Sequence, residues 1–400
     1  TTGGALTQAA GVALTSNVAD ISTGAGTVNL AGTANNFTTL NLSTTNADAS
    51  VVDTGGLALG TVNVGTGNFT LDTTGGALTQ TGALTSNVAD ITTGAGTATL
   101  TNAGNNLTGL ALNTSAAASV TDGSGGLDLG ASTVGGALTL NIAGDVTQSG
   151  SLVSSTSTTF NTSAVDTVLN LAGQANNLTG AVNLAADGGG NYTTVEIRND
   201  STGAGAIGGL GTAIGNLTLN YTAANIDLAT GLNVSNNLTL SSNGSVTQTG
   251  NVSVGNVADI TAANITLDNT TNNFTSLALN TSGANGDASI VDTGGLALGN
   301  VNLGAGNFTL DTTGGALTQA AGVALTSNVA DISTGAGTVN LAGTANNFTT
   351  LNLSTTNTDA SVVDTGGLAL GTVNLGTGNF TLNTTGGALT QAAGVALTSN

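Results

Sequence analysis

The chain repeats one stretch of eighty residues, which reads TTGGALTQAAGVALTSNVADISTGAGTVNLAGTANNFTTLNLSTTNADASVVDTGGLALGTVNVGTGNFTLDTTGGALTQ (residues 1–80) and returns at residues 312–391. Three differences separate the copies: Ala47 against Thr358, Val64 against Leu375, and Asp72 against Asn383. A glutamine after Leu-Thr or Val-Thr marks the same unit at Gln8, Gln80, Gln148, Gln248, Gln319 and Gln391. The sequence is therefore a repeat array, and this period outweighs the usual expectation that 400 residues form two or three globular domains.

A second marker, Asn followed by Phe or Leu and then Thr, subdivides the repeat. Most of its occurrences lie roughly 32 or 40 residues apart, but Leu217 and Leu238 are separated by 21. We interpret the short interval as a single structural turn and the wider ones as two turns each. This spacing predicts coils of roughly 16 to 21 residues, about four to each 72-residue repeat, which is within the range of solenoid proteins.

The residues within a coil alternate between apolar and polar. Phe69-Thr70-Leu71-Asp72 and Leu40-Asn41-Leu42-Ser43 have the period of two that turns one face of a β-strand inward. Gly and Asn interrupt this alternation every few residues, as in Gly65-Thr66-Gly67-Asn68, and both tolerate the backbone conformations of sharp corners. Short strands joined by corners are what a wound β-solenoid requires.

Stacking supplies the stability that one coil lacks, because each coil buries its inward residues only when another coil covers it. Strands of successive coils then pair about 4.8 Å apart around a continuous narrow core. We therefore predict an all-β fold, a parallel β-solenoid that is continuous over residues 1–400. Residues 186–209 depart from the pattern, and we expect an irregular coil or a protruding loop there. Because both ends of the sequence fall inside a repeat, we also expect the chain to be an internal part of a longer protein.

Composition excludes several classes of partner. One Arg or Lys against 21 acidic residues gives a formal charge of −20, so nucleic acid is not an expected partner, because phosphate binding needs clustered basic side chains. No apolar run is long enough to cross a bilayer as a helix, and we expect no membrane insertion. The chain has no Cys and no His, so thiol chemistry and imidazole ligands are absent, and we expect no cofactor.

One group of side chains could begin an argument for catalysis. Arg198 is the only basic residue of the chain, and Glu196, Asp187 and Asp200 lie near it in the sequence. An Arg base beside acidic residues would suit a polysaccharide-processing β-helix. The alternative is a surface ion pair that orders a loop and contributes about 0 to 1 kcal/mol. We favour the ion pair and expect no catalytic residues, because without His, Lys or Cys the group has few means of acid–base catalysis.

Two sets of aspartates recur with the repeat. Asp53, Asp292 and Asp364 lie in Val-Asp-Thr-Gly-Gly, whereas Asp20, Asp90, Asp259 and Asp331 lie in Val-Ala-Asp-Ile. Their regularity argues against one active site. Either set could line up as calcium ligands in stacked coils, but Asp at a corner is ordinarily a solvated turn former. We therefore predict no metal site.

The repeats resemble those of large filamentous haemagglutinin-like exoproteins of Gram-negative bacteria. The likeness is carried by runs such as Ala77-Leu78-Thr79-Gln80-Thr81-Gly82-Ala83-Leu84-Thr85 and Gly144-Asp145-Val146-Thr147-Gln148-Ser149-Gly150. It covers nearly the whole chain except residues 186–209. The resemblance implies a right-handed parallel β-helix, export by a two-partner or autotransporter route, and a place at the cell surface or outside the cell.

These features predict a non-catalytic structural shaft of an adhesin-like surface protein. Its expected partners are a host or neighbouring cell surface, carbohydrate, or other copies of the chain that associate through coil ends or sides. Two alternatives stay open. The first is a surface-layer or sheath component, and the second is a polysaccharide-processing β-helix enzyme with its site near Arg198.

Overall fold

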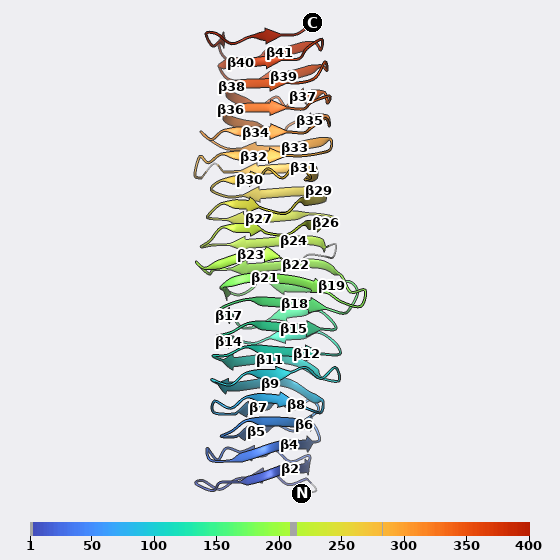
Figure 1. The fold of residues 1–400 in the computed structure, drawn as a ribbon, viewed down its shortest axis with the longest axis vertical. Coiled ribbons are helices and arrows are strands. Elements are labelled where there is room, and N and C mark those ends of the chain that lie inside the picture. Colours follow the sequence, from blue (N-terminus) through green and yellow to red (C-terminus); the bar gives the residue numbers. More distant parts are fainter. Residues whose placement is uncertain (1–2, 209–213, 282) are drawn as a thin grey trace. The chain divides into compact units, whose positions relative to one another are not determined.

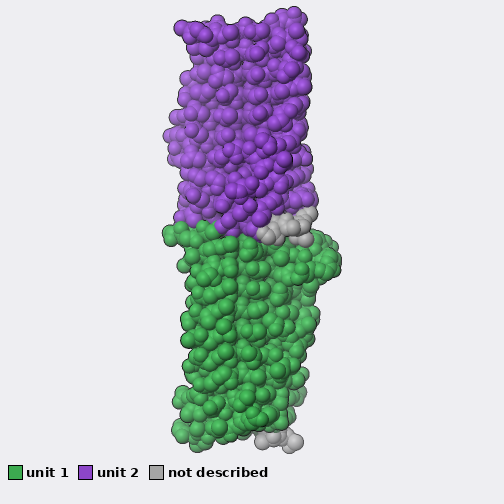
Figure 2. All heavy atoms as spheres, viewed as in Figure 1, with its two compact units in different colours: residues 1–205 green, residues 206–400 purple. Residues whose placement is uncertain are grey.

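The structure is a computed structural model that describes residues 3–208, 214–281 and 283–400. This part of the chain contains 43 β-strands and no helix, and therefore no helix there is long and apolar enough to cross a membrane. The chain divides into two compact units, residues 1–205 and 206–400, which are coloured separately in Figure 2. The division falls inside strand β23 (Ala204–Gly208).

The strands of both units are short. Those of unit 1 are β1 (Leu6–Thr7), β2 (Thr15–Gly24), β3 (Val28–Leu30), β4 (Asn36–Thr44), β5 (Ala49–Val52), β6 (Leu57–Asn63), β7 (Phe69–Asp72), β8 (Leu78–Gln80), β9 (Leu84–Gly94), β10 (Ala98–Leu100), β11 (Asn106–Thr114), β12 (Ala118–Asp122), β13 (Leu127–Leu129), β14 (Ser132–Val134), β15 (Leu138–Ile142), β16 (Val146–Gln148), β17 (Leu152–Ser154), β18 (Thr158–Thr162), β19 (Thr167–Leu171), β20 (Asn177–Leu178), β21 (Gly180–Ala186) and β22 (Tyr192–Asn199). Those of unit 2 are β24 (Ile214–Tyr221), β25 (Ile226–Leu228), β26 (Leu232–Val234), β27 (Leu238–Ser242), β28 (Val246–Gln248), β29 (Val252–Thr261), β30 (Ile265–Leu267), β31 (Asn273–Asn280), β32 (Ala288–Val291), β33 (Leu296–Asn302), β34 (Phe308–Asp311), β35 (Leu317–Gln319), β36 (Leu325–Ser333), β37 (Val339–Leu341), β38 (Asn347–Ser354), β39 (Ala360–Asp364), β40 (Leu368–Asn374), β41 (Phe380–Thr384), β42 (Leu389–Gln391) and β43 (Leu397–Thr398).

Strands of successive coils pair in parallel, as a β-solenoid requires. In unit 1, Val28 pairs with Ala49, Ala49 with Phe69, and Phe69 with Ala89, in steps of 21, 20 and 20 residues. Figure 1 shows the strands of each unit stacked coil upon coil. The described residues form about 18 turns, which confirms the predicted all-β parallel solenoid.

The register also shows how the sequence repeat relates to the coil. We call a column of strands that pair from coil to coil a stack. Leu6 pairs with Val28 and therefore belongs to the same stack as Phe69 and Ala89. Leu78 is the equivalent of Leu6 one repeat later, but it pairs with Leu57 in a different stack. It follows Phe69 by nine residues and precedes Ala89 by eleven, about half a coil from each. A repeat of 72 residues therefore spans about three and a half coils of 20 to 21 residues, not the four that were expected.

The predicted alternation of inward and outward residues is confirmed. Leu71 is 1% exposed, and the two neighbours that flank it in β7, Thr70 and Asp72, point outward. Two of the three differences between the near-identical copies fit this pattern. Val64 and its counterpart Leu375 are both buried, whereas Asp72 lies on the outer side.

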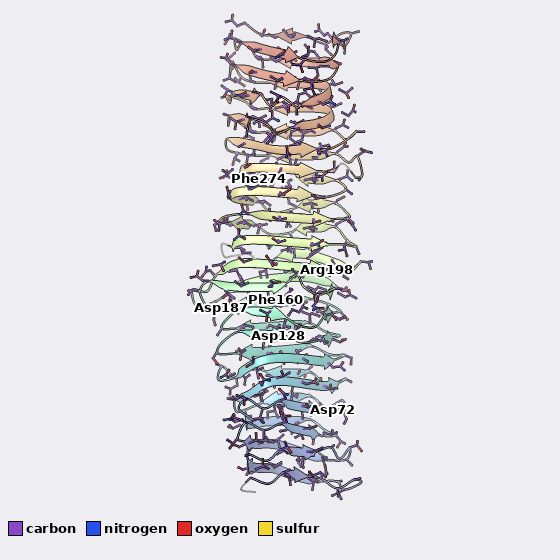
Figure 3. The ribbon with its side chains drawn as sticks, turned by 180° about the vertical axis from the view of Figure 1, so that it is seen from behind. Asp72, Asp128, Phe160, Asp187, Arg198 and Phe274 are labelled. Carbon is purple, nitrogen blue, oxygen red and sulfur yellow. The ribbon has the colours of Figure 1, made fainter. Side chains whose placement is uncertain are left out.

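The core of each unit is built mainly from Leu, Val, Ile and Ala with few aromatic side chains. Figure 3 labels two of these aromatic residues, Phe160 in unit 1 and Phe274 in unit 2, and both are buried. Small inward residues suit the narrow interior, because side chains of one coil pack directly against those of the coils above and below.

Residues 186–208 combine a regular strand with one irregular turn. Strand β22 pairs in parallel with β19, and one bulge interrupts their register between Thr167 and Val168. Within β22, Val195 and Ile197 are buried while Glu196 and Arg198 face outward, as the sequence predicts. Irregular backbone is found at the turn of residues 187–191, where Gly188 and Gly189 have positive φ angles of 63° and 90° that favour glycine. The expected limit of this region, Gly209, lies outside the described residues.

A charge placed in this core should unfold coils locally. Leu71→Asp buries a carboxylate without a partner, and we expect a loss of several kcal/mol of stability, on the order of 3 or more. Thr70→Asp adds the same charge one residue earlier, on the outer side, and should change stability by less than about 0.5 kcal/mol. Thermal melts followed by circular dichroism test both variants, and coinciding melts of Leu71→Asp and the parent would contradict the inward assignment.

Candidate functional site

The four residues suspected of catalysis do not come together. Arg198 forms a two-pronged ion pair with Asp200, in which Nη2 lies 2.7 Å from Oδ2 and Nε lies 3.0 Å from Oδ1. Asp187 instead accepts a hydrogen bond from the side chain of Asn161 at 2.6 Å. Figure 3 shows Asp187 and Arg198 at opposite edges of the coil. The group therefore reduces to one surface ion pair, and the Arg198 side chain is 39% exposed.

The backbone around Arg198 has a second role that repeats through the chain. The carbonyl oxygen of Arg198 accepts a hydrogen bond from Asn176, just as that of Val52 accepts one from Asn35. Asn199 then occupies the place that Asp53 holds in the first repeat. The segment that looked exceptional in the sequence is thus one version of a recurring corner.

The aspartates of Val-Ala-Asp-Ile do not line up as calcium ligands. Asp20 pairs across coils with Asn41, whose side chain donates to it at 2.5 Å, whereas Asp90 pairs with Thr70 in the other stack. Asp20 and Asp90 are one repeat apart, so about three and a half coils separate them and they lie in different stacks. Among the described residues, no three His, Cys, Asp or Glu side chains gather where they could share a metal ion.

The aspartates of Val-Asp-Thr-Gly-Gly are buried, which corrects the expectation of solvated corners. Asp53, Asp292 and Asp364 are each 0% exposed. Asp53 accepts a hydrogen bond from the backbone N–H of Phe37 at 2.6 Å and another from Gly55 at 3.0 Å. Both bonds recur at Asp292 and at Asp364. These carboxylates therefore serve as internal acceptors for backbone groups, with no oxygen turned to a ligand outside.

Burial makes two of these carboxylates, those of Asp53 and Asp292, harder to ionise. Burial raises the pKa of Asp53 and Asp292, and the hydrogen bonds from backbone N–H groups oppose this shift only in part. Asp122 holds the same place in the second repeat and accepts a bond from the N–H of Leu107 at 2.9 Å. Its Oδ2 atom is buried without a hydrogen-bond partner in the described structure, and burial raises the pKa of Asp122 to about 6.

Asn199 shows how an uncharged side chain fills this position. Its Oδ1 atom accepts hydrogen bonds from the backbone N–H groups of Leu178 and Ser201, at 3.0 and 3.1 Å. Its Nδ2 atom donates to the carbonyl oxygen of Leu178 at 2.9 Å. An amide thus satisfies the corner completely, and it avoids the cost of burying a charge.

Five marker glutamines, four of them half-buried, each bond to a buried asparagine in a contact that we call the amide pair. In the first repeat, Gln8 Nε2 donates to Asn35 Oδ1 at 2.6 Å, and Asn35 Nδ2 donates to Gln8 Oε1 at 3.1 Å. The same two-way bond joins four further pairs, which are Gln80 with Asn105, Gln148 with Asn176, Gln248 with Asn272, and Gln319 with Asn346. The five asparagines are at most 1% exposed.

Each asparagine of an amide pair links three successive coils. Asn105 accepts from the N–H of Leu84 in the preceding coil at 2.8 Å. It donates to the carbonyl of Leu100 in its own coil at 3.1 Å and to that of Thr121 in the next coil at 2.9 Å. One side chain therefore satisfies three buried backbone groups at a corner where the parallel ladder is broken.

The asparagines of the amide pairs can be recognised in the sequence, although the glutamine marker alone does not reveal them. Each is the first residue of an Asn-Asn doublet before the apolar residue of the second marker, as in Asn105-Asn106-Leu107. The separation from its glutamine ranges only from 24 to 28 residues across the five pairs. A buried Asn looks like a turn former in sequence, so the doublet reads as a corner until the coil length is known.

A hollow with a polar lining lies in the surface of unit 2. Its volume is about 590 Å³, and its lining includes Asp259, Asn302 and Thr326. Ala278 lies at this hollow, where the near-identical copies carry Asn41 and Asn352. The Asn41 side chain accepts a hydrogen bond from the N–H of Thr61, whereas the methyl group of Ala278 cannot accept an equivalent bond.

Removal of one amide pair should be far more damaging than its sequence suggests. Asn105→Ala leaves the N–H of Leu84 and the carbonyl groups of Leu100 and Thr121 without their partner, and we expect a loss on the order of 3 kcal/mol or more. Asn106→Ala removes the exposed second residue of the doublet and should cost less than about 1 kcal/mol. Denaturant unfolding compares the two, and equal losses would contradict the assigned role of the amide pair.

The buried carboxylate at Asp122 should make stability depend on pH in a definite direction. A pKa of about 6 in the folded state lies above the ordinary value of 3.8, so the folded chain holds this proton more tightly. The contribution of Asp122 to the free energy of unfolding should therefore fall as pH rises from about 4 to about 6 and stay low above that. Asp122→Asn should add on the order of 1 to 3 kcal/mol of stability at pH 7 and almost none at pH 3.

Asp90→Asn is the matched control for this measurement, since it removes the same formal charge from an exposed position in the same repeat. Its stability curve between pH 3 and pH 7 is the reference for the loss of one formal negative charge. A gain from Asp122→Asn that is equal at both pH values would show that the buried carboxylate does not titrate as described.

Comparison with known families identifies the repeats. A family model described as repeats of unknown function (DUF5649) matches residues 46–114, 115–185, 214–281 and 285–355, which together make up more than half of the chain. Each matched segment has about the length of one repeat. No curated protein and no solved structure matches the chain. The chain therefore belongs to the DUF5649 family of repeats of unknown function.

Proposed function

We propose that this chain is a non-catalytic structural shaft of a large secreted or surface-exposed bacterial protein of the adhesin type. The observation that carries the proposal is the recurrence of the amide pair. In five repeats, a buried asparagine ties three successive coils together, and the same residues return at each repeat. A module that binds both neighbours in the same way can be repeated many times without a new fold.

The use of polar side chains supports this role. The buried aspartates and the amide pairs form hydrogen bonds to backbone groups or to each other in the described structure. The sole Arg is engaged with Asp200. The chemistry of the repeat is thus directed at holding coils together.

The cell-surface part of the proposal rests on the resemblance to filamentous haemagglutinin-like exoproteins and on the composition. A thiol-free, acidic chain of repeats suits an environment outside the cell, where a high net charge keeps long proteins apart. Contact with a cell surface or with carbohydrate is part of the same proposal. The hollow beside Ala278 offers carboxylate, amide and hydroxyl groups for such contact.

The two alternatives differ in what they require. A sheath or surface-layer component would have to assemble with itself into an ordered array. The enzymatic alternative would need an assembled acid–base site around Arg198, but Asp187 lies apart from it and Asp200 is already paired with it. We therefore keep the sheath as the second candidate.

Electron microscopy of the chain and of a variant with one added 72-residue repeat inside unit 1 tests the shaft. Three and a half further coils at about 4.8 Å each should lengthen the particle by roughly 17 Å. Ordered sheets or tubes formed by the purified chain would favour the sheath instead. A particle whose length does not change would contradict both the shaft and the sheath.

The surface location is tested separately with an antiserum against the chain. Failure of the antiserum to bind intact cells would contradict that location.

A further inference from the structure

Because a repeat ends with half a coil, equivalent outward residues of successive repeats lie in different stacks. Asn29 in β3 and Thr99 in β10 are equivalent residues of successive repeats, and both are exposed. Asn29 pairs with Ser50, which pairs with Thr70. Thr99 instead pairs with Ser119, which pairs with Thr139, in the other stack. Equivalent outward residues of neighbouring repeats therefore lie about half a circuit apart around the coil.

Unit 2 follows the same rule independently. Leu317 and Leu389 are equivalent residues of two repeats. Leu317 pairs with Val339, which pairs with Ala360 and then with Phe380. Leu389 pairs with Leu368 in the other stack. The alternation therefore belongs to the repeat itself and is not a feature of one place in the chain.

Two successive repeats restore the original side. In unit 1, Val146 precedes the third marker glutamine and pairs with Leu127 of β13. Strand β13 pairs with the second half of β11, where Leu110 pairs with Ala89 of the first stack. The third repeat thus begins on the side where the first began, and the second begins on the other.

We propose that, within a unit, the parity of the repeat number sets the side of the solenoid on which the surfaces that follow the repeats are displayed. One added or lost repeat turns the later surfaces of the same unit by about half a circuit, whereas two leave them on the same side. The proposal rests on the register alone and does not depend on the function proposed above. For any partner that approaches from one side, a change of one repeat would hide a surface, and a change of two would only move it along the solenoid.

Simultaneous attachment of two labels to a flat surface shows whether the labels lie on the same side of the solenoid. The chain has no Cys, so Asn29→Cys and Thr70→Cys introduce its only two thiols, two coils apart in one stack. Each thiol carries desthiobiotin on a short linker, and dissociation from a dense planar layer of streptavidin is followed by surface plasmon resonance. With both labels on one side, dissociation should be roughly a hundredfold slower than from either single label.

In a lengthened protein, a second copy of residues 30–99 is inserted after Thr99. The first label stays at position 29 and the second is placed at the new copy of Thr70, so that one further repeat separates the two labels. The junction then joins Thr99 to Leu30, as Thr99 joins Leu100 in the parent. This protein should dissociate as fast as a singly labelled one. A protein with two added copies, labelled at the last Thr70, should regain slow dissociation. Circular dichroism melts confirm that all three proteins are folded.

Slow dissociation of the protein with one added copy would overturn the proposal, and so would fast dissociation of a folded protein with two added copies. If the lengthened chains do not fold, the parent chain without an insertion still tests the proposal. Labels at Asn29→Cys and Thr99→Cys of the parent lie in different stacks and should give no gain over one label. A gain comparable to that of the Asn29 and Thr70 pair would contradict the alternation directly.

Discussion

Backbone groups that leave the parallel ladder at the corners of each coil set the main constraint on this protein. Buried N–H and C=O groups are costly without partners, and a solenoid with narrow coils has many corners for its length. The amide pair meets this demand with a single asparagine that serves three coils, and the aspartate of the next corner serves the N–H groups of Phe37 and Gly55. The small apolar core can then suffice, because the polar corners are already satisfied.

Much of the fold could be predicted from the sequence because the period of two is local. The strand at Phe69–Asp72 and the inward positions of Leu71, Val195 and Ile197 follow from alternation alone. The number of coils in a repeat does not. The prediction of four coils assumed that a sequence repeat holds a whole number of coils. Equivalent strands of successive repeats, however, lie in either of the two stacks, so a new repeat can begin after half a coil.

The candidate site was harder to predict because its contacts join residues far apart in the chain. Asn35 and Asp53 each look like a corner residue, and alternation says nothing about a side chain that reaches into the neighbouring coil. The bond between Gln8 and Asn35 spans 27 residues and becomes visible only once the coils are stacked. Arg198 drew attention through its rarity, whereas its backbone carbonyl proved to be the recurring feature.

The span of the amide pair also bears on how the solenoid would yield under mechanical force. Without such links, a stack of parallel strands would peel one coil at a time, since each coil contacts only its neighbours. An asparagine that bonds to the preceding coil, its own coil and the next makes the loss of one coil break the bonds of two others. Peeling by an applied pull would then advance in steps of several coils, and the repeat rather than the coil would be the unit of mechanical resistance.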